Sequence, residues 1–218
     1  MNKKNYSIIL FDLDGTITDS GEGVTNSVMY ALGKYGIEVE NRAELYRFIG
    51  PPLIDSFMNY YGFDHEKAVE AVSYYREYYQ KTGIWENTVY EGIPELLKKM
   101  NDCGKRVLVA TSKPEHFARL ILEKHDIAKY FEFIAGASMD ESRSQKDEVI
   151  QYALESCNIT RMSDVVMVGD TKFDIIGANK FGMDSVGVLF GYGTEEELKK
   201  EGATYICENA EEIWNILA

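Results

Sequence analysis

Residues 8–20 read IILFDLDGTITDS, and the organisation of the whole chain can be worked out from this stretch. An apolar run from Ile8 to Phe11 ends abruptly in Asp12 and Asp14, which stand one residue apart. Four apolar residues in a row are typical of a strand buried on both faces, as in a parallel sheet covered by helices. Acids at the end of such a strand point to a ligand, because open α/β sheets bind ligands at the carboxyl ends of their strands.

Five more short apolar runs follow in the second half of the chain, separated by segments with helical periodicity. They cover residues 106–110, 131–135, 164–170, 184–190 and 203–207. Strands that alternate with helices in this way form a parallel sheet with helices on both faces. The sequence therefore predicts an α/β fold, a doubly wound parallel sheet with a Rossmann-like core.

The segment between the first strand and the second apolar run has a different texture. Residues 17–91 show helical periodicity and no convincing strand, with a break at Gly50-Pro51-Pro52. This predicts an all-helical domain inserted after strand one, and a catalytic core made of residues 1–16 and 92–218. Four tyrosines in the insertion are expected mainly in its core, with a ligand-binding aromatic patch as the alternative; they are Tyr74, Tyr75, Tyr78 and Tyr79.

Composition limits the partners and the compartment. The chain has 218 residues, 45% of them hydrophobic, and a formal net charge of −13 with an isoelectric point near 4.7. Nucleic acids and anionic membrane surfaces would repel such a protein. No secretory signal or membrane-length apolar stretch is evident, so we expect a cytoplasmic protein. Cys103, Cys157 and Cys207 are too widely spaced for a metal motif and are expected to be reduced thiols.

Four acids follow two of the predicted strands. In an extended segment, Asp12 and Asp14 point the same way and repel unless a cation or a shared proton joins them. An Asx-turn at Asp14 is the structural alternative, but it leaves Asp12 unexplained. Asp170 follows the 164–170 run, and Asp174 comes four residues later, where it is either part of the site or an acid in the first turn of a helix.

A set of oxygen ligands without histidine or cysteine favours Mg²⁺, which commonly bridges carboxylates and a substrate phosphate. A phosphate also needs donors, and Thr111-Ser112-Lys113-Pro114 offers a hydroxyl and backbone N–H groups after the 106–110 strand. Either Lys113 or Lys146 can neutralise the phosphoryl oxygens. Spacing alone does not choose between these two lysines.

Four motifs occur in a recognisable order: DLDGT at Asp12–Thr16, Thr111, Lys146 before a helix, and GDTKFD at Gly169–Asp174. In order and spacing they resemble the haloacid dehalogenase superfamily, and the helical insertion resembles its helical cap. The phosphoglycolate phosphatase-like group is similar in addition through GVLFGYG at Gly187–Gly193. That group commonly has Asn after the threonine and Pro after the lysine, whereas this chain has Ser112 and Asp147.

The resemblance implies a magnesium-dependent phosphatase that forms an aspartyl-phosphate, and it selects Lys146 over Lys113. It makes Asp12 the nucleophile and Asp14 the acid and base. The implied Mg²⁺ contacts come from Asp12, Asp170 and the backbone carbonyl of Asp14. Asp174 is implied to orient these ligands without binding the metal itself. The implied substrate contacts come from Thr111, the Ser112 amide, Lys146, Gly15 and Thr16.

The substrate is expected to be a small phosphorylated metabolite such as phosphoglycolate or a nucleoside monophosphate. Arg47, in the YRFIGPPL stretch at residues 46–53, either reads the leaving group or is a solvated residue beside a helix break. A β-phosphoglucomutase-type mutase and a non-catalytic phosphate-binding regulatory protein are the alternative functions. The chain is expected to be a monomer or homodimer that binds neither nucleic acid nor membrane.

Overall fold

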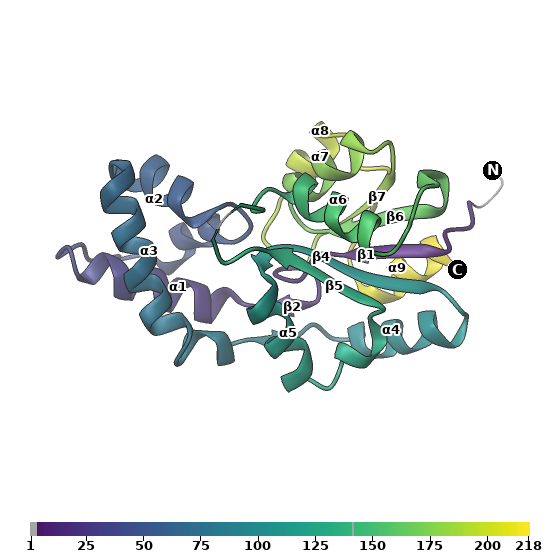
Figure 1. The fold of residues 1–218 in the computed structure, drawn as a ribbon, viewed down its shortest axis with the longest axis horizontal. Coiled ribbons are helices and arrows are strands. Elements are labelled where there is room, and N and C mark those ends of the chain that lie inside the picture. The colour runs from purple at the N-terminus through teal and green to yellow at the C-terminus, as the bar shows by residue number, and fades with distance from the viewer. Residues whose placement is uncertain (1–3, 141) are drawn as a thin grey trace. The chain divides into compact units, whose positions relative to one another are not determined.

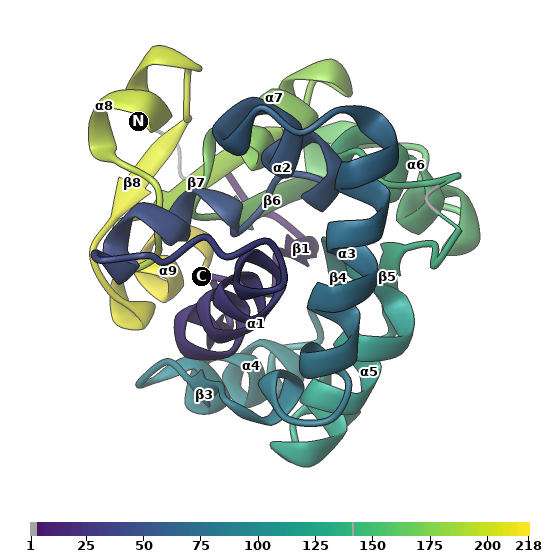
Figure 2. The same cartoon turned by 90° about the vertical axis from the view of Figure 1, so that its left-hand side faces the viewer.

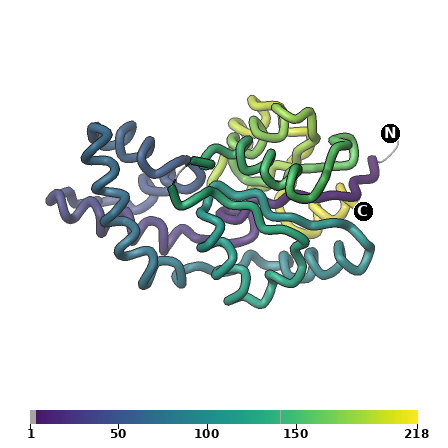
Figure 3. The backbone as a smooth tube through the Cα atoms, viewed as in Figure 1, coloured from purple at the N-terminus to yellow at the C-terminus, as the bar shows by residue number. Residues whose placement is uncertain are grey.

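A computed structural model describes residues 4–140 and 142–218, and the chain divides into two compact units. The α/β unit contains the chain up to Thr18 together with Val89–Ala218, and the helical unit is Asp19–Thr88. The predicted domain limits, after residues 16 and 91, lie within a few residues of these points. The chain leaves the α/β unit after Thr18 and returns to it at Val89, a few residues before α4 (Figure 3).

The α/β unit is built on a six-stranded sheet in the order β5-β4-β1-β6-β7-β8 (Figure 1). The strands are β1 (Ile8–Phe11), β4 (Arg106–Pro114), β5 (Phe133–Ala137), β6 (Val165–Gly169), β7 (Asp184–Val188) and β8 (Tyr205–Cys207). Every neighbouring pair is parallel. The predicted doubly wound parallel sheet is confirmed, and β1 lies in it between β4 and β6.

Helices cover both faces of this sheet (Figure 1). They are α4 (Ile93–Asp102), α5 (Glu115–Lys124), α6 (Lys146–Ser156), α7 (Lys172–Lys180), α8 (Glu195–Lys200) and α9 (Ala210–Leu217). Two single-turn helices, η3 (Ala128–Tyr130) and η4 (Met162–Asp164), complete the unit. On one face, α6 contributes Val149 and Ile150 to a core with Leu10 of β1 and Met167 of β6. This packing fixes the position of α6 along the strands, and with it the position of Lys146, the first residue of α6.

The helical unit contains α1 (Gly21–Gly33), η1 (Arg42–Phe48), α2 (Leu53–Tyr61), α3 (His65–Tyr79) and η2 (Gly83–Trp85). Helices α1 and α3 pack side by side (Figure 2). The sequence did not predict the two short strands β2 (Thr18–Asp19) and β3 (Thr88–Val89), which pair where the chain passes between the units. Two residues per strand are too few to give a periodic signal.

The tyrosines of α3 divide between core and surface. Tyr75 and Tyr79 are buried, and their rings stack with centroids 5.4 Å apart. Tyr74 and Tyr78 are half-buried and donate hydrogen bonds to Glu70 and Glu86. Only half of the set thus lies in the core of the unit. Within residues 4–140 and 142–218, no helix has the length and apolar character needed to span a membrane.

Two glycines of α1 offer a matched test of the packing in the helical unit. A β-carbon at Gly23 would lie 2.0 Å from the Gly83 carbonyl oxygen, whereas a β-carbon at Gly33 would meet no atom within 4 Å. We expect Gly23→Ala to lower the free energy of unfolding by about 1–3 kcal/mol, because backbone must move. Gly33→Ala should raise it by about 0.5–1 kcal/mol. Urea titration followed by circular dichroism measures both, and equal effects would contradict the packing of α1 against η2.

Candidate active site

The carboxyl ends of β1 and β6 place three buried carboxylates together. The backbone N–H of Asp12 donates to the Val168 carbonyl at 2.9 Å, so the ladder between β1 and β6 continues to the end of both strands. Asp170 follows directly after β6, and Asp174 lies in the first turn of α7. One oxygen from each of Asp12, Asp170 and Asp174 lies within 4.8 Å of the others. Three of the four acids predicted to form one cluster therefore do so, and the Asp14 carboxylate is not part of this group.

The Asp170 carboxylate is held on two sides. Its Oδ1 accepts a hydrogen bond from the Thr16 hydroxyl at 3.2 Å, and its Oδ2 accepts one from the Tyr192 backbone N–H at 2.8 Å. A β-carbon would lie 2.1 Å from Oδ2 at Gly15 and 2.4 Å from it at Gly191. Gly15 also has a φ of +81°, which favours glycine. Gly15 and Thr16, predicted to contact substrate, thus contact Asp170 in the protein.

Sequence reasoning assigned no contact to Tyr192 or Gly191. Both lie in the Gly187–Gly193 stretch that was noted only for its family resemblance. Its closely spaced glycines were the available signal, because glycine clusters mark places where backbone approaches another group. Which group they approach depends on the pairing of β6 with β7, and that pairing brings the loop after β7 to Asp170.

Asp174 takes part in a helix cap and in the acid cluster. Its Oδ2 accepts hydrogen bonds from the backbone N–H of Thr171 at 3.0 Å and from the Thr171 hydroxyl at 2.9 Å, as part of a capping box. Its Oδ1 lies 2.8 Å from Lys146 Nζ. A β-carbon at Gly169 would lie 2.1 Å from Asp174 Cγ. The two alternatives from the sequence both apply, one to each carboxylate oxygen.

Lys146 is the cation of the acid cluster. It is the first residue of α6, and its Nζ lies 2.7 Å from Asp12 Oδ1 and 2.8 Å from Asp174 Oδ1. Nζ also donates a hydrogen bond to the Ala110 carbonyl at 3.1 Å, so three oxygens lie close to this ammonium group. The side chain of Lys146 is only 5% exposed. The spacing of the motifs did not distinguish Lys113 from Lys146. In the structure, Lys146 is the lysine that contacts Asp12.

Burial and nearby negative charge raise the pKa of Asp12 and of Asp170. Burial raises the pKa of Asp12, Lys146 lowers it, and the charge of Asp174 raises it again. The pKa of Asp170 is raised well above its usual value by burial and then by Asp174 and Asp12. Burial alone would lower the pKa of Lys146, but Asp12 and Asp174 reverse this and raise it.

Three buried carboxylates thus face one ammonium group. The excess of negative charge and the all-oxygen donor set fit a hard divalent cation. Asp12 and Asp174 each direct Oδ1 at Lys146, whereas the Asp170 oxygens accept hydrogen bonds from neutral groups, the Thr16 hydroxyl and the Tyr192 N–H.

Asp14 lies apart from this cluster and pairs with the second lysine. Its Oδ2 is 2.9 Å from Lys113 Nζ, and the two side chains are 12% and 6% exposed. Its Oδ1 is buried and has no hydrogen-bond partner among the residues that the structure describes. Coordination of a metal by the Asp14 backbone carbonyl stays a prediction.

Thr111 and Ser112 lie at the same edge of the sheet. They belong to the end of β4, which pairs with β1 up to Phe11 and Val109. Thr111 is 1% exposed, and its hydroxyl oxygen accepts a hydrogen bond from the Lys113 N–H at 3.2 Å. Hydroxyl and amide donors are therefore present at the edge where Asp12 ends its strand.

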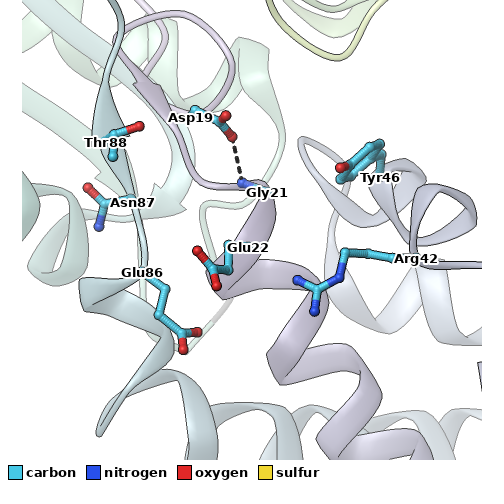
Figure 4. Close-up of a pocket in the computed structure, with 8 residues that line it drawn as sticks. All are labelled: Asp19, Gly21, Glu22, Arg42, Tyr46, Glu86, Asn87 and Thr88. Carbon is cyan, nitrogen blue, oxygen red and sulfur yellow. Dashed lines mark hydrogen bonds between the residues drawn. The ribbon is translucent and has the colours of Figure 1, made fainter.

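Arg47 belongs to the helical unit, where its guanidinium stacks over the ring of Tyr60 at 4.3 Å. The same unit contains a cavity of about 240 Å³, lined by Arg42 and Tyr46 but not by Arg47 among the described residues (Figure 4). Its other lining residues are Asp19, Gly21, Glu22, Glu86, Asn87 and Thr88. Arg47 as a substrate contact stays a prediction, and the η1 residues that line this cavity are Arg42 and Tyr46.

Comparison with known proteins defines the family. Residues 9–188 match the model of the haloacid dehalogenase-like hydrolases. The chain is 42% identical to a protein of Pseudomonas aeruginosa named 5'-nucleotidase, over 97% of this chain and 96% of that protein. It is 25% identical to a phosphoglycolate phosphatase of Vibrio parahaemolyticus, over 100% of this chain and 99% of the relative.

Solved structures agree with this assignment. A predicted phosphatase from Clostridium acetobutylicum superposes with a TM-score of 0.94 and 49% identity, over 97% of each chain. The fold and the acid cluster together define the class: an α/β protein with a parallel sheet and a group of carboxylates at the carboxyl edge of that sheet. The chain belongs to the haloacid dehalogenase-like hydrolase family.

Divalent cations should stabilise the folded protein, because a cation relieves the repulsion among the three buried carboxylates. At a hundredfold excess of Mg²⁺ over its Kd, the melting temperature should rise by about 5–10 °C relative to chelator. Asp170→Asn should remove most of this rise. Asp102→Asn, which loses an exposed pair with Lys98, is the control and should keep it. A full rise in Asp170→Asn, measured by differential scanning calorimetry, would contradict the metal assignment.

Proposed function

We propose that this protein is a magnesium-dependent phosphatase that hydrolyses a small organic phosphomonoester through an aspartyl-phosphate on Asp12. The observation that carries the proposal is the contact of Asp12 Oδ1 with Lys146 Nζ at 2.7 Å, beside Asp170 and at the end of β1. A carboxylate in this place has a cation to orient it and a second acid close by to share a metal. The family membership supports hydrolytic chemistry at phosphate esters.

The reaction needs one nucleophile and one proton carrier. A carboxylate oxygen of Asp12 attacks the phosphorus, the bond to the leaving oxygen breaks, and Asp14 gives that oxygen a proton. Asp14 then takes a proton from a water molecule, whose oxygen attacks the phosphorus of the aspartyl-phosphate and restores Asp12. Each residue ends the cycle in its starting state, and the net reaction consumes one water molecule.

The remaining groups hold the phosphoryl oxygens. We assign this role to the Thr111 hydroxyl, the Ser112 N–H and Lys146, because positioning and charge account for most of the catalysis of phosphoryl transfer. Asp12, Asp170 and the backbone carbonyl of Asp14 would hold Mg²⁺. When bound, Mg²⁺ supplies positive charge to phosphoryl oxygens that gain negative charge in the transition state.

The helical unit is proposed to select the leaving group, since the residues at the sheet edge address only the phosphoryl group that all candidate substrates share. Its cavity contains three carboxylates, from Asp19, Glu22 and Glu86, and one guanidinium, from Arg42. This balance disfavours a carboxylate such as that of phosphoglycolate and favours a neutral group rich in hydrogen-bond donors. A nucleoside monophosphate is therefore the proposed substrate class, in line with the 5'-nucleotidase name of the 42% identical relative.

Phosphate release from 4-nitrophenyl phosphate tests the function. The wild-type protein should release phosphate with Mg²⁺ and lose that activity in excess chelator. Asp12→Asn keeps the side-chain shape but removes the nucleophile, so turnover and the acid-quenched phosphoenzyme should disappear together. An active Asp12→Asn variant would overturn the proposed nucleophile, and activity unchanged in chelator would overturn the metal requirement. Asp102→Asn serves again as the control.

Two arginines of η1 test the choice of substrate. Arg42 lines the cavity and donates a hydrogen bond to the Thr25 hydroxyl at 3.2 Å, whereas Arg47 stacks on Tyr60. Arg42→Ala should lower kcat/KM for adenosine monophosphate about tenfold more than for 4-nitrophenyl phosphate. Arg47→Ala, the change suggested by the sequence, should affect both substrates equally. The reverse result would restore Arg47 as the selective residue, and equal losses from both variants would exclude η1 from substrate choice.

A further inference from the structure

We propose that Lys113 is a positioning residue for Asp14: it restrains one carboxylate oxygen and leaves the other to carry the proton. This inference rests on the proposed function, in which Asp14 is the acid and base. It assigns a task to the lysine that the family resemblance had set aside in favour of Lys146.

The contact that carries the inference is the ion pair between Lys113 Nζ and Asp14 Oδ2 at 2.9 Å. With side chains 6% and 12% exposed, the pair is shielded from water, so its electrostatic attraction is screened less than that of a surface pair. The other oxygen, Oδ1, is buried and receives no hydrogen bond from any residue in the described parts of the chain. The two oxygens of one carboxylate are therefore in different environments, one held and one available.

The backbone around Lys113 explains why its side chain takes this direction. Strand β4 pairs Thr111 with Gly136 and Pro114 with Ala137, so the register of β4 shifts across Ser112 and Lys113. Such a bulge re-aims the side chains within it. The N–H of Lys113 donates to the Thr111 hydroxyl at 3.2 Å, which links the direction of Lys113 to the predicted phosphate-binding residue.

Gly136 in the neighbouring strand makes room for the bulge. A β-carbon at Gly136 would lie 2.7 Å from the Lys113 carbonyl oxygen and 2.6 Å from the Glu115 backbone nitrogen. Any other residue at this position would push β4 away from β5. The place of Lys113 is thus determined by a backbone feature and not by the freedom of a long side chain.

The two lysines divide the catalytic aspartates between them. Lys146 contacts Asp12 and Asp174, and Lys113 contacts Asp14. Lys146 lies against Asp12, Asp174 and the Ala110 carbonyl, whereas Asp14 pairs with Lys113. Removal of Lys113 should therefore release Asp14 without loosening Asp12. This predicts an effect on turnover and little effect on substrate binding.

A double-mutant cycle on 4-nitrophenyl phosphate with saturating Mg²⁺ tests the inference. Lys113→Met should lower kcat by about 10–100-fold, the usual effect of losing a residue that orients a functional group, and should change KM by less than about twofold. Lys113→Arg should restore part of the lost kcat, because it keeps a cation at this position. In an Asp14→Asn background, Lys113→Met should cause no further loss, because its target is already gone.

The controls separate this inference from the proposed function. Lys98→Met removes an exposed ion pair with Asp102 and should keep wild-type activity. Circular dichroism checks the folding of each variant, and Lys113→Gln replaces Lys113→Met if the latter does not fold. Full activity in Asp14→Asn would overturn the proposed acid and base and with it the inference.

Three other outcomes would overturn the inference alone. An inactive Asp14→Asn combined with a normal Lys113→Met would show that Asp14 needs no help from Lys113. A raised KM at unchanged kcat would show that Lys113 binds substrate directly. An equal loss from Lys113→Met in both backgrounds would show that Lys113 acts independently of Asp14.

Discussion

The ion cluster around Lys146 is the constraint on which the rest of the site depends. A lysine that is 5% exposed touches two buried aspartates, and a third lies within 4.8 Å of them. Burying this much charge is unfavourable unless each group has partners, because the desolvation of ions is costly. The α/β unit supplies those partners from five places: the ends of β1 and β6, Ala110 of β4, and the first turns of α6 and α7. None of these elements can shift without leaving a buried charge unpaired.

Glycine is the residue that allows the loops to close on this cluster. Gly15, Gly169 and Gly191 each stand where a β-carbon would overlap a carboxylate of Asp170 or Asp174. The close approach lets backbone and hydroxyl groups, such as the Tyr192 N–H and the Thr16 hydroxyl, bond directly to Asp170. The carboxylates are thereby oriented by backbone, which moves less than side chains do. A pre-oriented set of this kind suits a metal and a phosphate better than a flexible one.

The two units differ in how much of them a single sequence reveals. The edge of the sheet carries the family motifs, and the phosphoryl group proposed to bind there has the same shape and charge in every candidate substrate. None of the motifs that indicated the family lies in the helical unit. Its α1, α2 and α3 are defined by ordinary packing, with Tyr75 and Tyr79 in the core, and its cavity mixes acids with Arg42. A cavity built in this way leaves no spacing pattern in the sequence.

The sequence alone determined the parallel α/β fold, because buried strands and amphipathic helices have distinct periods. It also predicted a cluster of Asp12, Asp14, Asp170 and Asp174, because strand ends meet at one edge, and the structure groups all of these except Asp14. It also recognised Lys146, through family motifs. Tertiary structure decided the partners. The Gly187–Gly193 loop reaches Asp170 only because β6 pairs with β7, and Lys113 reaches Asp14 only because a bulge opposite Gly136 turns it there. Strand pairing and bulges bring together residues that are far apart in the chain. The residue pattern along one strand does not specify which strand pairs with it or where a bulge occurs.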